Sequence, residues 1–179
     1  VLTALNQLWQ LHFDNVTLQT IGLQLGADVP FFVSPHPSAY AQGIGEQLSP
    51  IELPARELLL IKPNVHADTR EVYQHPLLVR DHVPLDMGAS ALSEQLKILN
   101  ARTTLSNDMQ AAAFAIAPKI KRVHDTLQHL VPHTYVRMSG SGATVFACPQ
   151  NSAERDALNQ WLKTCPEDWQ HRWCHTLSE

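Results

Sequence analysis

The chain has 179 residues, of which 44% are hydrophobic, and this length and composition suit a globular protein with one substantial core or two smaller ones. Its formal net charge of −4, with scattered basic residues, argues against nucleic-acid binding, which needs a concentrated basic face. No apolar stretch approaches the length of a membrane span, so we expect a cytoplasmic protein that acts on a small molecule.

The first part of the chain predicts two helices, two short strands and a turn, at residues 1–11, 15–25, 31–33, 39–42 and 43–45. The apolar helical stripe that starts at Val1 has no cap before it, so we expect the chain to begin inside a helix and to be a fragment. Asn15 and Thr17 are candidate caps of the second helix, and Gly26 is its stop signal. A stretch punctuated by prolines favours a domain boundary between residues 54 and 55.

The remainder predicts helices and strands at residues 57–62, 69–75, 90–100, 108–131, 134–138, 144–148, 152–164 and 170–177. Pro118 should kink the long helix or divide it. The elements follow a β-α-β-β-α-β order, which is typical of a ferredoxin-like split βαβ fold with helices on one side of an antiparallel sheet. We therefore predict an α+β protein in which residues 55–179 form the ferredoxin-like domain.

No cluster typical of a metal site is apparent in the sequence. Cys148, Cys165 and Cys174 have no paired spacing, which disfavours both a disulfide framework and structural zinc, so we interpret them as passive thiols. The ten histidines include no pair at the helical spacing of metalloproteases. We expect no metal held by protein ligands alone.

Asp28 is the candidate catalytic residue. It is a lone carboxylate in the run LGADVPFF at residues 25–32. A carboxylate close to an apolar interior has a tunable proton affinity, which suits a base that acts on a hydroxyl. The alternative is that Asp28 caps a helix or closes a turn after Gly26.

A second informative run, MSGSGAT at residues 138–144, lies between two predicted strands. Its glycines and serines would expose backbone N–H groups that can bind phosphate or a sugar hydroxyl. The alternative is a hairpin turn with glycine at its positive-φ positions. Gly140, Ser141 and Gly142 are the candidate binding residues of this loop.

Taken together, the two runs make the chain similar to the GHMP kinases over nearly its whole length. In that family an LGADVPFF-like run carries the catalytic aspartate, a Gly/Ser loop lies in the carboxy-terminal domain, and an SND segment opens a long helix. Here these are Asp28, residues 139–143 and residues 106–108. The resemblance implies a GHMP-kinase-like fold, with residues 1–54 as the last part of its amino-terminal α/β domain. Asn107 or Ser106 is interpreted as a helix cap.

The branch that the chain resembles uses ATP, with Mg²⁺, to phosphorylate the 2-hydroxyl of 4-diphosphocytidyl-2-C-methyl-D-erythritol in isoprenoid precursor synthesis. The resemblance therefore implies a cytidine diphosphate compound as substrate and Asp28 as the base. It adds Ile44, in a GVGE-like turn completed by Glu46, and Thr69 and Tyr73, in a short helix, as substrate-binding residues. Tyr73 could stack on cytosine or only pack, and Thr69 could only cap its helix.

The chain also departs from the family pattern. Ser141 stands where relatives often carry threonine, and Asp68 and Arg70 replace prolines, which weakens the transfer of roles to Thr69 and Tyr73. The family's lysine and its PxxxGLGGGSS-like ATP loop would precede Val1, and Lys62 is no substitute, so we expect the chain to be inactive alone. The alternatives are a kinase for mevalonate or homoserine, or a non-catalytic binding module; a monomer and a homodimer are both compatible with the sequence.

Overall fold

A computed structural model describes residues 1–80, 88–100, 102–103 and 105–177. Contacts between residues divide the chain into two units, and one break falls between Pro54 and Ala55. The first unit also contains helix α5 (Ala89–Leu96), which the sequence placed with the carboxy-terminal domain. The reason is a tertiary contact, in which the Ser93 hydroxyl donates a hydrogen bond of 2.8 Å to the Glu52 carbonyl.

Apart from α5, the described residues of the first unit form three helices and a two-stranded antiparallel sheet: α1 (Leu2–Leu8), α2 (Asn15–Leu25), α3 (Val29–Val33), β1 (Ala39–Gln42) and β2 (Gln47–Pro50). Strands β1 and β2 form a hairpin across the predicted turn, with Gln42 opposite Gln47. The sequence predicted β1 and the turn but missed β2.

Local predictions in this unit needed three corrections. The Asp14 carboxylate caps α2 by accepting a 2.8 Å bond from the Thr17 N–H, so neither Asn15 nor Thr17 is the cap. Residues 31–33 belong to helix α3 and not to a strand, because Pro30 near the helix start pre-sets helical φ. Helix α1 also ends at Leu8, three residues before the predicted end.

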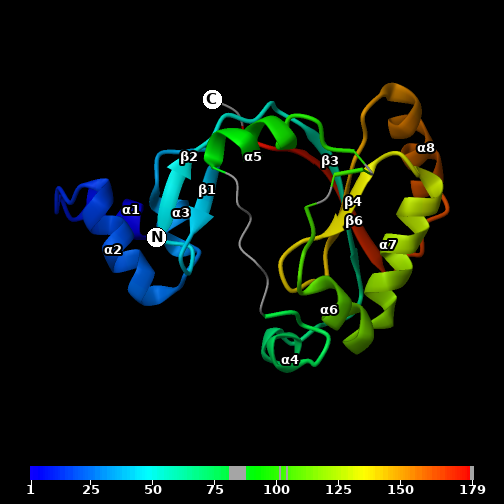
Figure 1. Ribbon diagram of the computed structural model, residues 1–179, viewed down its shortest axis with the longest axis horizontal. Helices are drawn as coiled ribbons and strands as arrows, with labels where there is room; N and C mark the ends of the chain where they lie inside the picture. The colour runs from blue at the N-terminus through cyan, green and yellow to red at the C-terminus, as the bar shows by residue number, and fades with distance from the viewer. Residues whose placement is uncertain (81–87, 101, 104, 178–179) are drawn as a thin grey trace. The chain divides into compact units, whose positions relative to one another are not determined.

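The second unit has four strands and four helices among its described residues: β3 (Glu57–Pro63), α4 (Thr69–Gln74), α6 (Gln110–Ile116), α7 (Pro118–Leu130), β4 (Tyr135–Met138), β5 (Val145–Cys148), α8 (Ser152–Leu162) and β6 (Trp169–His175). The strand order is β4-β5-β3-β6 and every neighbouring pair is antiparallel. Helices α7 and α8 lie on the same side of this sheet (Figure 1). The predicted ferredoxin-like α+β arrangement is confirmed.

The core of this unit lies where α7 packs against the sheet. Leu59 and Ile61 of the interior strand β3 have no exposed surface. Their partners on α7 are equally buried and recur at helical spacing, at Ile120, Val123 and Leu127. The long helix predicted at residues 108–131 is two helices, because Pro118 opens α7 and has no N–H to continue α6.

Burial raises the pKa of the Cys148 and Cys165 thiols, which keeps both protonated and supports their interpretation as passive.

None of the helices in the described ranges combines the length and the apolar character needed to cross a bilayer.

Candidate functional site

The Gly/Ser loop at residues 139–143 joins β4 to β5 as a tight turn. The Ser139 N–H donates to the Thr144 carbonyl at 2.9 Å, and the Gly142 N–H donates to the Ser139 carbonyl at 3.0 Å. Gly140 and Gly142 have φ values of +54° and +96°, a region that favours glycine. The hairpin-turn interpretation of these glycines is therefore correct as far as backbone shape is concerned.

The same loop also has open hydrogen-bond donors. Within the described part of the chain, the N–H groups of Gly140 and Ser141 have no hydrogen-bond partner. Gly140 is exposed and Ser141 is half-buried. Successive N–H groups in a left-handed turn form a concavity that binds anions. The loop can therefore accept a phosphate oxygen without breaking any hydrogen bond of its own.

Helix α4 brings Thr69 to this loop, where its hydroxyl oxygen lies 2.9 Å from that of Ser141. The alternative that Thr69 caps the helix is wrong. The cap is Asp68, whose carboxylate accepts the N–H groups of Arg70 and Glu71 at 2.8 and 3.1 Å. The replacement of proline by aspartate at this position thus supplies a helix cap and leaves the Thr69 hydroxyl to contact the loop.

Tyr73 lies one helical turn beyond Thr69, on the same side of α4. Tyr73 is 55% exposed, so a large part of it is not packed against the rest of the protein. An exposed aromatic ring can stack on a base.

A cavity of about 840 Å³ opens beside the loop, a volume in the range that accommodates small organic ligands. Thr69, Ser141 and Gly142 line it, together with residues from the end of β3 and the start of β6. Lys62 and His66 also line this cavity, and neither was predicted to do so. No local pattern could have done so, because pairing of Lys62 with Gln170 across β3 and β6 brings these segments together.

Asn107 has a role that the sequence analysis missed. The Asn107 amide donates to the carbonyls of Met138 and Gly140, at 2.9 and 2.7 Å. Its side-chain oxygen accepts the Met109 N–H at 3.0 Å. The prediction that Asn107 or Ser106 caps the helix is therefore wrong, because the N-cap residue of α6 is Met109 and the Asn107 side chain instead holds the Gly/Ser loop.

Asp28 lies in the first unit, at the amino-terminal end of α3. It is exposed, and its side chain makes no capping hydrogen bond. The expectation that it lies against an apolar interior is wrong, because the following residues form a short helix on which Phe32 is itself 77% exposed. The alternative is correct for the backbone, because Asp28 is the N-cap residue of α3 and lies in the turn that the Val29 N–H closes on the Gly26 carbonyl at 3.1 Å, although its carboxylate makes no capping bond. The carboxylate is available to a ligand.

The turn after β1 lies directly against the residue before Asp28. A Cβ atom on Gly45, where φ is +123°, would come within 2.8 Å of the Ala27 carbonyl oxygen. Ile44 is 71% exposed at the tip, and its N–H donates to the Glu46 carboxylate at 2.8 Å. Bonds from the backbone N–H groups of Glu46 itself and of Ile44 hold the pKa of the Glu46 carboxyl below its usual value.

The predicted site residues therefore form two groups, one in each unit. Asp28 and Ile44 belong to the first unit. Thr69, Tyr73 and the loop belong to the second unit. Across the described ranges, no group of three or more His, Cys, Asp or Glu side chains could hold a metal ion.

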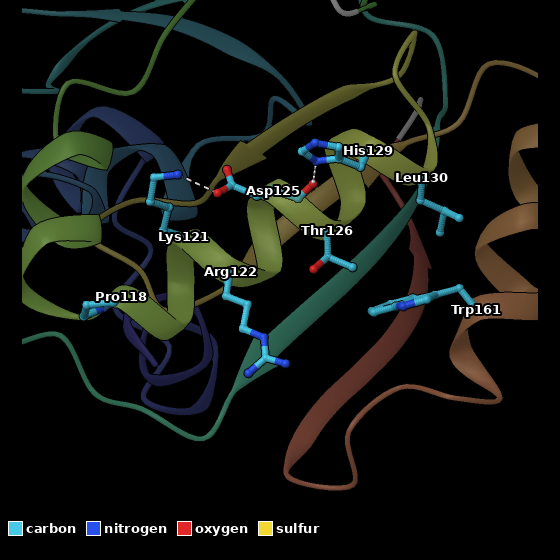
Figure 2. Close-up of a pocket in the computed structure, with 8 residues that line it drawn as sticks. All are labelled: Pro118, Lys121, Arg122, Asp125, Thr126, His129, Leu130 and Trp161. Atoms are coloured by element: carbon cyan, nitrogen blue, oxygen red, sulfur yellow. Dashed lines mark hydrogen bonds and ion pairs between the residues drawn. The ribbon is translucent and has the colours of Figure 1, made fainter.

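A second hollow, of about 730 Å³, lies along α7 and is bordered by Trp161 of α8 (Figure 2). Lys121 forms an ion pair there with Asp125, and the His129 Nδ1 atom lies 2.7 Å from the Asp125 carbonyl oxygen. These polar groups are already paired with one another, and none of the predicted site residues lines the hollow. The candidate site is therefore the cavity beside the Gly/Ser loop.

No protein-family model matches the chain. A relative from Polynucleobacter asymbioticus is 39% identical over 171 residues, which cover 94% of this chain and 54% of the relative. A crystal structure of mevalonate kinase from L. major shares the fold, with a TM-score of 0.51 and 15% identity over 98% of this chain and 63% of that one. The chain is thus similar to curated kinases over nearly its whole length and shares the fold of the GHMP kinases.

The Polynucleobacter relative is named 4-diphosphocytidyl-2-C-methyl-D-erythritol kinase, and this chain spans about half of its length (54%). A crystal structure of 4-(cytidine 5'-diphospho)-2C-methyl-D-erythritol kinase matches 96% of this chain and 60% of its own, with a TM-score of 0.67 and 27% identity. The particular kinases that the chain resembles are thus named for a single acceptor, 4-diphosphocytidyl-2-C-methyl-D-erythritol.

Proposed function

We propose that this chain supplies the base and part of the acceptor site for transfer of the γ-phosphoryl group of ATP to the 2-hydroxyl of 4-diphosphocytidyl-2-C-methyl-D-erythritol. This reaction serves isoprenoid precursor synthesis, in the cytoplasm. The observation that carries the proposal is the meeting of α4 with the Gly/Ser loop at one cavity, through the bond between Thr69 and Ser141. The match to kinases of this name over 94% of the chain supports it.

Each residue has a separate part in this reaction. The Asp28 carboxylate takes the proton from the acceptor hydroxyl. The open N–H groups of Gly140 and Ser141 bind a phosphate oxygen, and Gly142 gives the loop its shape. Tyr73 stacks on cytosine and Ile44 supplies an apolar contact. Phosphoryl transfer asks a protein mainly for such positioning and charge stabilisation. Mg²⁺ would enter bound to the phosphates of ATP.

The 179 residues include no run that resembles the family's glycine-rich ATP loop. We therefore expect the chain alone to bind the cytidine substrate without ATP-dependent phosphorylation. Calorimetric titration with 4-diphosphocytidyl-2-C-methyl-D-erythritol, mevalonate and homoserine tests the first part, and a coupled assay of ADP release tests the second. Saturable binding of the cytidine compound only, with no turnover, is the expected result.

Turnover should appear in a fused protein, in which this chain replaces the matching part of the Polynucleobacter relative. Binding of mevalonate or homoserine in place of the cytidine compound would leave the family assignment intact and overturn the acceptor. A fused protein that folds but neither binds nor phosphorylates any of the three alcohols would favour the non-catalytic alternative.

Tyr73 gives a sharper test of the cytidine assignment. Stacking between a base and an aromatic side chain contributes about 1–3 kcal/mol, so Tyr73→Ala should raise the Kd for the cytidine substrate by about 5-fold to 150-fold. Tyr73→Phe keeps the ring and should retain wild-type affinity. Because the side chain is 55% exposed, both variants should unfold at nearly the wild-type temperature. Equal affinities for Ala and Phe variants would contradict stacking.

A further inference from the structure

Two side chains, one from the first residue of α6 and one from the segment before it, hold the last peptide groups of β4, which is an edge strand of the sheet. The Gln110 side-chain oxygen accepts the Met138 N–H at 3.0 Å. The Asn107 amide donates to the Met138 carbonyl at 2.9 Å. Gln110 and Asn107 therefore satisfy both backbone polar groups of Met138, and the strand enters the Gly/Ser loop in a fixed orientation.

Asn107 then reaches past the strand into the loop. The same amide nitrogen donates a second bond, of 2.7 Å, to the Gly140 carbonyl, while the Asn107 oxygen accepts the Met109 N–H at 3.0 Å. Two donors and one acceptor on one short side chain are provided by an asparagine amide. A carboxylate of the same shape would keep the acceptor but would place negative charge against two carbonyl oxygens.

The bond to Gly140 has a directional consequence for the neighbouring donor. The Gly140 carbonyl and the Ser141 N–H belong to one planar peptide group, and in a trans peptide these two bonds point in opposite directions. Holding the carbonyl toward Asn107 therefore turns the Ser141 N–H away from Asn107. This N–H is one of the loop donors that have no partner within the described part of the chain.

We infer that Asn107 is a positioning residue, which orients the Gly140–Ser141 peptide group so that the Ser141 N–H faces the ligand cavity. The identity of the ligand, a cytidine diphosphate compound bound through a phosphate oxygen, rests on the proposed function. The orientation of the loop does not, because it follows from the hydrogen bonds of Asn107 alone.

The variant Asn107→Asp removes both donors at constant shape, and Asn107→Ala removes them without adding charge. The matched control is Asn151→Asp, because Asn151 caps α8 only as an acceptor, for the Glu154 N–H at 2.9 Å. Amide exchange measured by NMR on the 179-residue chain should be at least 10-fold faster at Ser139 and Gly142 in both Asn107 variants. It should be unchanged in Asn151→Asp.

Titration with cytidine diphosphate supplies the second measurement. The Kd should rise about 10-fold in Asn107→Asp and in Asn107→Ala, whose unfolding transitions remain cooperative, and stay at the wild-type value in Asn151→Asp. Wild-type loop exchange in both Asn107 variants would overturn the inference, whatever the chain binds. The wild-type chain could also bind no cytidine compound while loop exchange is still faster in the Asn107 variants. That result would uphold the inference and overturn the proposed function.

Discussion

Replacing Asp28 by asparagine should lower the kcat of the fused protein by about 10²-fold to 10⁴-fold, the usual contribution of a positioned general base. The substitution keeps the size of the side chain and removes its ability to take a proton. The KM for the cytidine substrate should change little, because the carboxylate acts on the hydroxyl as the reaction proceeds and contributes little to ground-state binding. Steady-state kinetics of the purified fused protein measure both quantities.

The structure offers a matched control for this change. Asp14 occupies the same position relative to α2 as Asp28 does to α3, but only Asp14 makes a side-chain capping bond. Asparagine also caps helices well, so Asp14→Asn should retain activity and stability. Asp28→Asn should leave the unfolding temperature unchanged, since no hydrogen bond is lost. Full activity of Asp28→Asn would remove Asp28 from the proposed reaction.

Adding a methyl group at Gly142 should damage both the stability and the binding of the loop. Gly142 has φ of +96°, and a Cβ there would meet the Ile120 Cδ1 and Met138 Sδ atoms, each at 3.1 Å. Backbone strain of this kind costs about 1–3 kcal/mol. We expect Gly142→Ala to lose about that much unfolding free energy in urea titrations, and to bind the cytidine substrate at least 10-fold more weakly.

Gly88→Ala is the comparison for Gly142→Ala. Gly88 has an ordinary φ of −73°, and no atom lies within 4 Å of an added Cβ. Its replacement should cost clearly less unfolding free energy and leave the Kd for the cytidine substrate unchanged. Equal losses of unfolding free energy in the two variants would show that the positive φ of Gly142 and its close approach to Ile120 do not destabilise Gly142→Ala.

Periodicity predicted much of the fold because the second unit has long, regular apolar patterns. The buried positions of α7 and the apolar run of β3 could be read without tertiary information, and their order gave the ferredoxin-like arrangement. The first unit was harder. The five residues of α3 are too few to distinguish a helix from a strand by spacing. Strand β2 contains Gln47 and Pro50 and has no apolar alternation to indicate it.

The candidate site shows the same division between local and long-range information. Glycine content indicated the loop shape, because positive φ is a local property of Gly140 and Gly142. The partners of the loop could not be predicted in this way. Asn107 contacts the Gly140 carbonyl across 33 positions of sequence, and Thr69 contacts Ser141 across 72. A short polar residue before a helix is most simply explained as a helix cap, and Asn107 was predicted to be one for that reason.

The placement of α5 bears on the order in which the polypeptide can mature on the ribosome. The hydrogen bond from Ser93 to the Glu52 carbonyl joins residues 41 positions apart, so the amino-terminal unit cannot be completed until well into synthesis of the following unit. Until then the Glu52 carbonyl lacks its hydrogen bond from Ser93. The first unit can therefore make its final contacts only after α5 has emerged.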